Sequence, residues 1–186
     1  MYIQSMKTIL KITKNELSTL FYSPIAWLIL IIFTFQSGMA YAEAWADALR
    51  SQALGYTVYG ATERLLLGWS GAISSMQEHL YLYIPLLTMG LMSQEYNRGS
   101  IKLLYSSPVT NKQIIFGKYL SMIIYALILV AILFIYYAFT AFTIKAIDTT
   151  FVMTALLGIF LMICAYAAIG LFMSSLTSYQ VVAAVG

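Results

Sequence analysis

The sequence predicts an all-α integral membrane protein with an N-terminal interfacial helix, four full transmembrane helices and the start of a fifth. The 186 residues are 61% hydrophobic and only 9% charged, whereas a soluble domain has about 25% charged residues. Four apolar stretches approach the roughly 20 helical residues that cross a hydrocarbon layer about 30 Å thick. We therefore expect residues 1–186 to form one transmembrane domain.

Residues 3–22 predict an amphipathic helix ahead of the first span. At 100° per residue the apolar side chains fall on one arc, which contains Met6, Ile9, Leu10, Leu17, Leu20 and Phe21. Lys7, Lys11 and Lys14 fall on the opposite side. Such a helix lies in the headgroup plane with its lysines toward anionic lipid, so we expect membrane lipid as a partner. It ends at Ser23-Pro24, because proline disfavours helical geometry in the residue before it.

The expected spans are residues 25–42, 76–93, 119–142 and 151–172, and a fifth span starts at 180–186. Pro85 is expected to kink or open the second span, which neighbouring membrane helices can tolerate. Because the last apolar stretch stops about a quarter of the way into a span, we expect a truncated chain. Ala40-Tyr41-Ala42 is similar to a signal-peptide cleavage site, but the long structured segment before the first apolar stretch favours a retained span.

Basic residues in the loops predict the orientation. The helix 3–22 and the loop 94–118 together contain seven Lys and Arg, and the opposite loops contain three. The positive-inside rule therefore places the N-terminus and residues 94–118 in the cytoplasm. On the other side, residues 43–77 are expected to form a long loop. Its apolar stretch 65–73 is too short to span and should dip into the interface or pack against neighbouring helices.

The loop 94–118 has a helix–break–helix pattern. Residues 100–105 continue as helix, and Ser106-Ser107-Pro108 interrupts it. Thr110 with Gln113 three positions later is a capping box, which starts a new helix by satisfying its first backbone donors. This helix runs directly into the third span. A loop joined rigidly to two spans can transmit force from a soluble partner, although it can also be a plain polar connection.

The motifs of this loop resemble those of the type-2 ATP-binding-cassette exporter permeases. The matching pattern is Glu95-x-x-x-Gly99-Ser100-x-x-x-Leu104-x-x-x-Pro108-Val109-Thr110, followed by Ile114-Ile115-x-Gly117-Lys118. Within that family the chain looks most like the gliding-motility and nitrous-oxide-reductase-maturation branches. The family often has an acidic residue where this chain has Lys102, so no ion pair is carried over to that position.

The resemblance implies a permease with six spans that works as a dimer, with an ATPase subunit for each chain, in the bacterial cytoplasmic (inner) membrane. It implies that the N-terminal helix and the loop meet the ATPase. The residues expected to couple ATP hydrolysis to transport are Glu95, Arg98, Gly99, Pro108 and Thr110, with Lys7, Lys11 and Lys14 orienting the N-terminal helix. The permease partner could be an identical or a different chain, and the substrate is not identified.

The chain has no recognisable site for nucleotide, metal or nucleic acid. Gly117-Lys118 is not a phosphate-binding loop, because Lys112 replaces its first glycine and Tyr119 replaces its serine or threonine. ATP and Mg²⁺ are therefore expected on the partner subunit, and no catalytic residue is expected here. His79 and Cys164 are single residues of their types. Glu78-His79 is expected to lie hydrated at the interface, and a substrate or proton contact is the alternative.

Two other functions remain as alternatives to an exporter permease. An ion-coupled secondary transporter normally has charged groups or broken helices at mid-membrane, and spans 119–142 and 151–172 have no charged side chain there. An intramembrane enzyme would need a nucleophile, acid–base or metal constellation that the spans lack. A non-transporting membrane anchor or assembly subunit is harder to separate from a permease by sequence.

Overall fold

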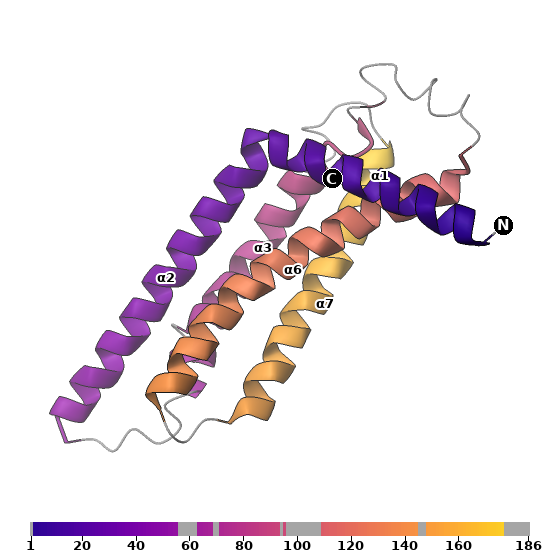
Figure 1. Ribbon diagram of the computed structural model, residues 1–186. Coiled ribbons are helices and arrows are strands. Elements are labelled where there is room, and N and C mark those ends of the chain that lie inside the picture. The colour runs from indigo at the N-terminus through magenta and orange to yellow at the C-terminus, as the bar shows by residue number, and fades with distance from the viewer. Residues whose placement is uncertain are drawn as a thin grey trace. The chain divides into compact units, whose positions relative to one another are not determined.

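The computed structural model describes residues 2–55, 63–68, 71–93, 95, 109–144 and 148–176 of the chain, and these contain helices and no strand. The elements are α1 (Tyr2–Tyr22), α2 (Pro24–Ala53), a short π-helix η1 (Glu63–Leu67), α3 (Ala72–Thr88), α6 (Asn111–Thr143) and α7 (Thr149–Leu176) (Figure 1). The all-α prediction is confirmed. The break between α1 and α2 falls at Ser23, as Pro24 predicted.

Within the described part of the chain, three helices are long and apolar enough to cross a membrane. They are α2, α6 and α7, with 30, 33 and 28 residues, and they contain the predicted spans 25–42, 119–142 and 151–172. The predicted span 76–93 corresponds to α3, which has 17 residues and continues through Pro85. The prediction of four full spans is therefore not confirmed, and residues 180–186, where a fifth span was expected, lie outside the described part.

The predicted loop 43–77 is wrong in its first part, because α2 continues as helix to Ala53. Residues 43–53 contain alanine, glutamate, leucine and glutamine, which are strong helix formers, and no glycine or proline. Gly55 ends the helix with a φ of 81°, a left-handed conformation that glycine adopts readily, and its N–H donates to the carbonyl of Gln52. The charges that suggested a loop are carried by an exposed helix, where Asp47 and Arg50 form an ion pair at 3.6 Å.

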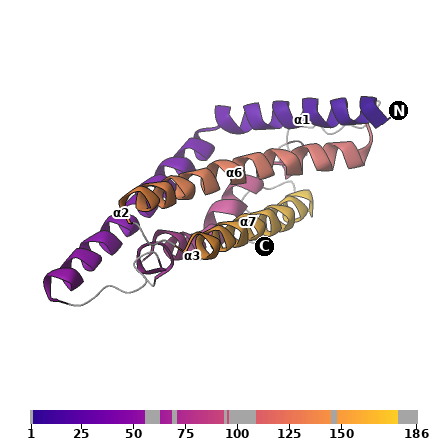
Figure 2. The same cartoon turned by 60° about the horizontal axis from the view of Figure 1, so that its bottom comes forward.

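The described residues belong to two compact units. The first combines the described parts of Met1–Leu28, Tyr81–Ala126 and Ile163–Gly186: α1, the start of α2, the end of α3 and the adjoining halves of α6 and α7. In this unit α1 runs beside the N-terminal half of α6, as Figures 1 and 2 show. Thr13 and Leu20 on α1 are buried, while Met6 and Leu10 are 61% and 56% exposed. The amphipathic helix therefore has a packed face and an exposed apolar stripe next to its lysines.

The second unit combines the described parts of Ile29–Leu80 and Leu127–Met162. Hydroxyl groups join α2 to the second half of α6: the hydroxyls of Tyr41 and Thr140 are 2.7 Å apart, and Tyr136 donates to the carbonyl of Thr34 at 3.2 Å. In η1, Leu65 and Leu66 are buried. The described part of the apolar stretch 65–73 thus packs within the protein, as Ala72 and Ile73 are buried too; this was one of the two outcomes predicted for it.

Candidate functional site

The most prominent polar feature of the first unit is the buried ammonium group of Lys118. Its Nζ lies 2.8 Å from Oε1 of Glu16 on α1 and 2.8 Å from Oε1 of Glu95. The side chain of Lys118 is 2% exposed, and those of Glu16 and Glu95 are 16% and 18% exposed. One cation on α6 therefore connects the N-terminal helix to a residue shortly after the end of α3.

The two carboxylates account for the burial of this lysine. An ammonium removed from water is strongly unfavourable unless it is paired and hydrogen-bonded, and lysine has three N–H donors to satisfy. Glu16 and Glu95 each accept one of them. Because the three residues are 102 and 23 positions apart along the chain, the cluster can form only when α1, Glu95 and α6 are correctly placed.

A second group of contacts holds α1 close to the first turns of α6. The hydroxyl of Thr13 lies 3.1 Å from the carbonyl oxygen of Gly117, and Nε2 of Gln113 donates to the hydroxyl of Ser5 at 2.9 Å. A Cβ atom on Gly117 would lie 2.6 Å from Cγ2 of Ile12, which no real Cβ tolerates without a shift. Glycine at position 117 therefore permits the close approach that brings Lys118 to Glu16.

The capping box predicted at the start of α6 is present. The backbone N–H of Thr110 donates to Oε1 of Gln113 at 3.0 Å, and the N–H of Gln113 lies 3.4 Å from the hydroxyl oxygen of Thr110. These two bonds satisfy backbone donors that the helix cannot satisfy itself. They fix where the chain enters α6, two turns before Lys118.

The chain leaving α3 is held by α7. The hydroxyl of Ser174 accepts hydrogen bonds from the backbone N–H groups of Met92 and Ser93 at 3.0 and 3.2 Å, and it donates to the carbonyl of Met89 at 3.0 Å. One turn earlier, Gly170 lies directly against the side chain of Thr88. Both ends of the connection between α3 and α6 are thus anchored, one by α7 and the other by α1.

The predicted coupling residues are only partly within the described residues. Glu95 belongs to the ion-pair cluster and Thr110 to the capping box, whereas Arg98, Gly99 and Pro108 lie outside the described part. So do the predicted helix 100–105 and Lys102. Lys7, Lys11 and Lys14 are exposed on α1.

Sequence reasoning missed Glu16 and Lys118 as site residues. Lys118 was counted only as a positive-inside charge, although it lies well inside a helix that continues as an apolar span. An ionisable side chain in such a place usually has a partner, and this signal could have identified it. Its partner Glu16 could not be identified, because nothing local relates two residues separated by 102 positions.

Glu78 and His79 lie at the other end of α3, in the second unit. Glu78 is exposed, and Nδ1 of His79 lies 2.7 Å from the carbonyl oxygen of Ser75. A carbonyl accepts only, so a neutral His79 carries its proton on Nδ1. Within the described residues, no group of three or more His, Cys, Asp or Glu side chains could hold a metal ion.

The long apolar helices define a multi-pass α-helical membrane protein. Residues 10–186 match the model of the ABC-2 family transporter proteins, and the chain belongs to this family. A stretch of 54 residues, 29% of the chain, is 37% identical to the uncharacterized protein YhcI of Bacillus subtilis (strain 168), and it spans 17% of that protein's length. No solved structure matches the chain.

The matched model describes transporter proteins, so family membership supports a membrane transport component. The secondary-transporter and anchor alternatives are not favoured by this assignment.

Proposed function

We propose that the chain is the permease subunit of an ATP-driven exporter in the bacterial cytoplasmic membrane, with its N-terminus in the cytoplasm. It pairs with a second permease chain, and ATP and Mg²⁺ bind to the partner ATPases. Within the family, we propose the branch of the gliding-motility and nitrous-oxide-reductase-maturation permeases, because the chain resembles it in the loop motif described above. The observation that carries the proposal is the Glu16–Lys118–Glu95 cluster.

The cluster gives the proposed coupling a physical route. Glu16 on α1 and Glu95 in the loop 94–118 each have a carboxylate oxygen 2.8 Å from the ammonium of Lys118. A force applied to α1 or to the loop at Glu95 therefore acts on Lys118. Lys118 is part of the continuous helix α6, which extends to Thr143. Closure of the ATPases would therefore move α1 and α6 together, and the paired permeases would switch between inward-open and outward-open states.

Co-purification tests the partner and the coupling surface together. The full-length chain is extracted in mild detergent from its native host, and bound proteins are identified by mass spectrometry. We expect an ATPase with the wild type and its loss when Glu95 and Arg98 are charge-reversed. Charge reversal of Asp47 and Arg50, an exposed ion pair on α2, is the matched control and should retain the ATPase. No ATPase under several extraction conditions would contradict the proposal.

The orientation of the chain in the membrane and the direction of transport need separate measurements. A cysteine at position 106 should react with an impermeant thiol reagent only from the cytoplasmic side, and labelling from outside would contradict the coupling arrangement. Export is tested with the permease and its ATPase in inside-out vesicles, where ATP added outside should drive substrate accumulation in the lumen.

A further inference from the structure

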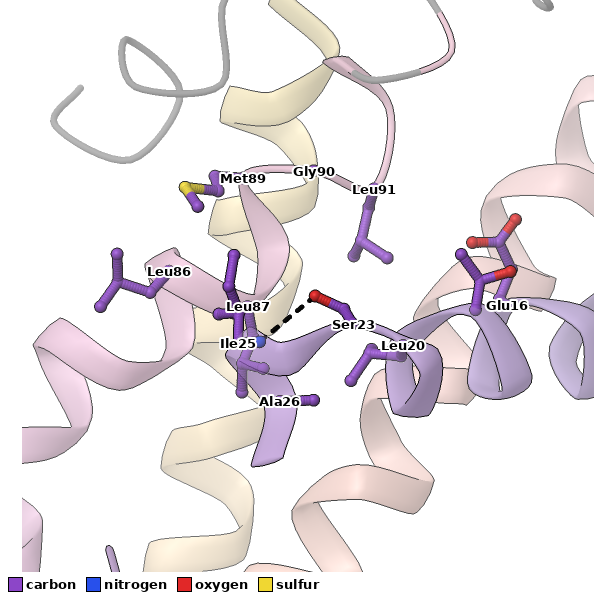
Figure 3. A pocket seen from close by; sticks show the side chains of 11 residues that line it. Glu16, Leu20, Ser23, Ile25, Ala26, Leu86, Leu87, Met89, Gly90 and Leu91 are labelled. Atoms are coloured by element: carbon purple, nitrogen blue, oxygen red, sulfur yellow. Dashed lines mark hydrogen bonds between the residues drawn. The ribbon is translucent and has the colours of Figure 1, made fainter. Parts of the chain in front are cut away.

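A partly open pocket of about 90 Å³ lies in the first unit, where α1 turns into α2 beside the end of α3 (Figure 3). Glu16 and Leu20 line one side and Leu86, Leu87 and Met89 the other, with Ile25 between them. One water needs roughly 10–15 Å³ on the same measure, so the pocket has room for a small polar group.

The electrostatics of the pocket favour a cation. Glu16, whose side chain is 16% exposed, is the one acidic residue among those that line it, and none of these residues is basic. The C-terminal ends of α1 and α3, at Tyr22 and Thr88, both adjoin the pocket, and neither helix has a basic residue in its last turn. Helix C-termini carry partial negative charge from the aligned dipoles of the helix, and they attract cations.

Among the described residues, two nearby positive groups are already engaged. The ammonium of Lys118 is divided between Glu16 and Glu95. The N-terminal end of α2 also adjoins the pocket, where the hydroxyl oxygen of Ser23 lies 3.4 Å from the backbone N–H of Ile25 and caps it (Figure 3). The side of the pocket formed by Glu16 and the two helix C-termini therefore keeps its preference for a positive charge.

The surroundings favour an organic ammonium over a metal ion. Ca²⁺ takes six to eight oxygen ligands, and the pocket offers a single carboxylate among mostly aliphatic side chains. Aliphatic walls suit the methylene groups of an aminoalkyl chain. Next to the pocket, Tyr22 is 87% and Leu28 is 55% exposed, which suits the apolar part of an amphiphile.

We propose that this pocket binds the primary ammonium group of an amphiphile, with the ammonium at Glu16. In a membrane the abundant source of this group is the headgroup of an ethanolamine phospholipid, and a cationic amphiphile carried by the transporter is a second source. Binding of the ammonium group at this pocket does not depend on the proposed coupling to an ATPase.

Thr19→Lys tests the site while keeping all three residues of the ion-pair cluster. Thr19 lines the pocket on the last turn of α1, and its hydroxyl donates to the carbonyl of Asn15 in the same helix. A lysine there places a tethered ammonium in the pocket as an internal competitor. Asn15→Lys adds the same charge on α1 at a residue that does not line the pocket, and is the matched control.

The measurement is thermal stability of the purified full-length chain in detergent, titrated with phosphatidylethanolamine, phosphatidylcholine, phosphatidylglycerol or octylammonium. We expect phosphatidylethanolamine to raise the midpoint of thermal unfolding in the wild type and in Asn15→Lys. In Thr19→Lys its apparent affinity should be at least tenfold weaker. Stabilisation by octylammonium as well supports recognition of any ammonium amphiphile, and stabilisation by phosphatidylethanolamine alone supports the lipid source. Equal stabilisation by phosphatidylcholine or phosphatidylglycerol, no stabilisation at all, or an unchanged response of Thr19→Lys would overturn the proposal.

Discussion

Replacing Lys118 by methionine removes the ammonium that joins α1 to α6 while keeping most of the aliphatic stem. Glu16 and Glu95 would then lose their bonds to Nζ. Removing one partner of a buried ion pair costs about 3–5 kcal/mol. The two carboxylates are 16% and 18% exposed and can be partly rehydrated, so we expect the lower end, about 3 kcal/mol. At 1.4 kcal/mol for each factor of ten, the equilibrium constant for the opening of α1 should increase about 100-fold.

Hydrogen exchange measures this opening directly, because α1 amides exchange when the helix undocks and frays. The rates for residues 9–20 should rise about 100-fold in Lys118→Met, on the scale just derived. Lys112→Met removes an exposed lysine from the first turn of the same helix, and it should leave these rates unchanged. Adding Glu16→Gln to Lys118→Met should restore part of the loss, since one uncompensated carboxylate is then removed. A change of less than threefold in Lys118→Met would refute the claim that this ammonium holds α1.

Three further predictions follow from the packing and hydrogen bonds. Gly170→Ala places a Cβ 2.8 Å from Cβ of Thr88, so the thermal midpoint should fall by an amount equivalent to about 1–3 kcal/mol, and Thr88→Gly in the same chain should recover most of it. Gln113→Ala removes the side-chain half of the capping box, the bond from the N–H of Thr110 to Oε1 of Gln113, and leaves the bond from the N–H of residue 113 to the hydroxyl of Thr110. The first turn should be destabilised by about 1 kcal/mol, so exchange at residues 110–114 should become faster, and unchanged exchange would show that this bond is dispensable. A double-mutant cycle of Tyr41→Phe and Thr140→Val should give a coupling near 0.6 kcal/mol, as is typical between membrane helices, and a value above about 2 kcal/mol would contradict this view of the contact.

Local signals in the sequence predicted local structure well. The break before Pro24 and the capping box at Thr110 each depend on residues within three positions of one another, and both are present. The helix that contains the first predicted span extends beyond that span, because the expected length was set by the bilayer and not by the chain. At about 1.5 Å per residue, the 30 residues of α2 extend about 45 Å, well beyond a hydrocarbon layer of about 30 Å.

The candidate site was harder to predict because it is assembled over long sequence separations. The loop motif contains both Glu95 and Lys118, but a motif does not show that two of its side chains pair. The face of α1 that packs on α6 includes Thr13 and Glu16, which are polar. A hydrophobic pattern does not mark these two residues, since their contacts are made by a hydroxyl and a carboxylate.

The anchors at the two ends of the connection between α3 and α6 become available at different times during synthesis. Ribosomes add about 5–20 residues per second. Glu16 and Glu95 are synthesised before Lys118, so both carboxylates are present when its ammonium group is made. The backbone groups of Met92 and Ser93 must wait for Ser174, which is 82 and 81 residues later, or about 4–16 seconds at that speed. During that interval water or the insertion machinery has to satisfy them, and the chain leaving α3 acquires these bonds only once α7 has been made.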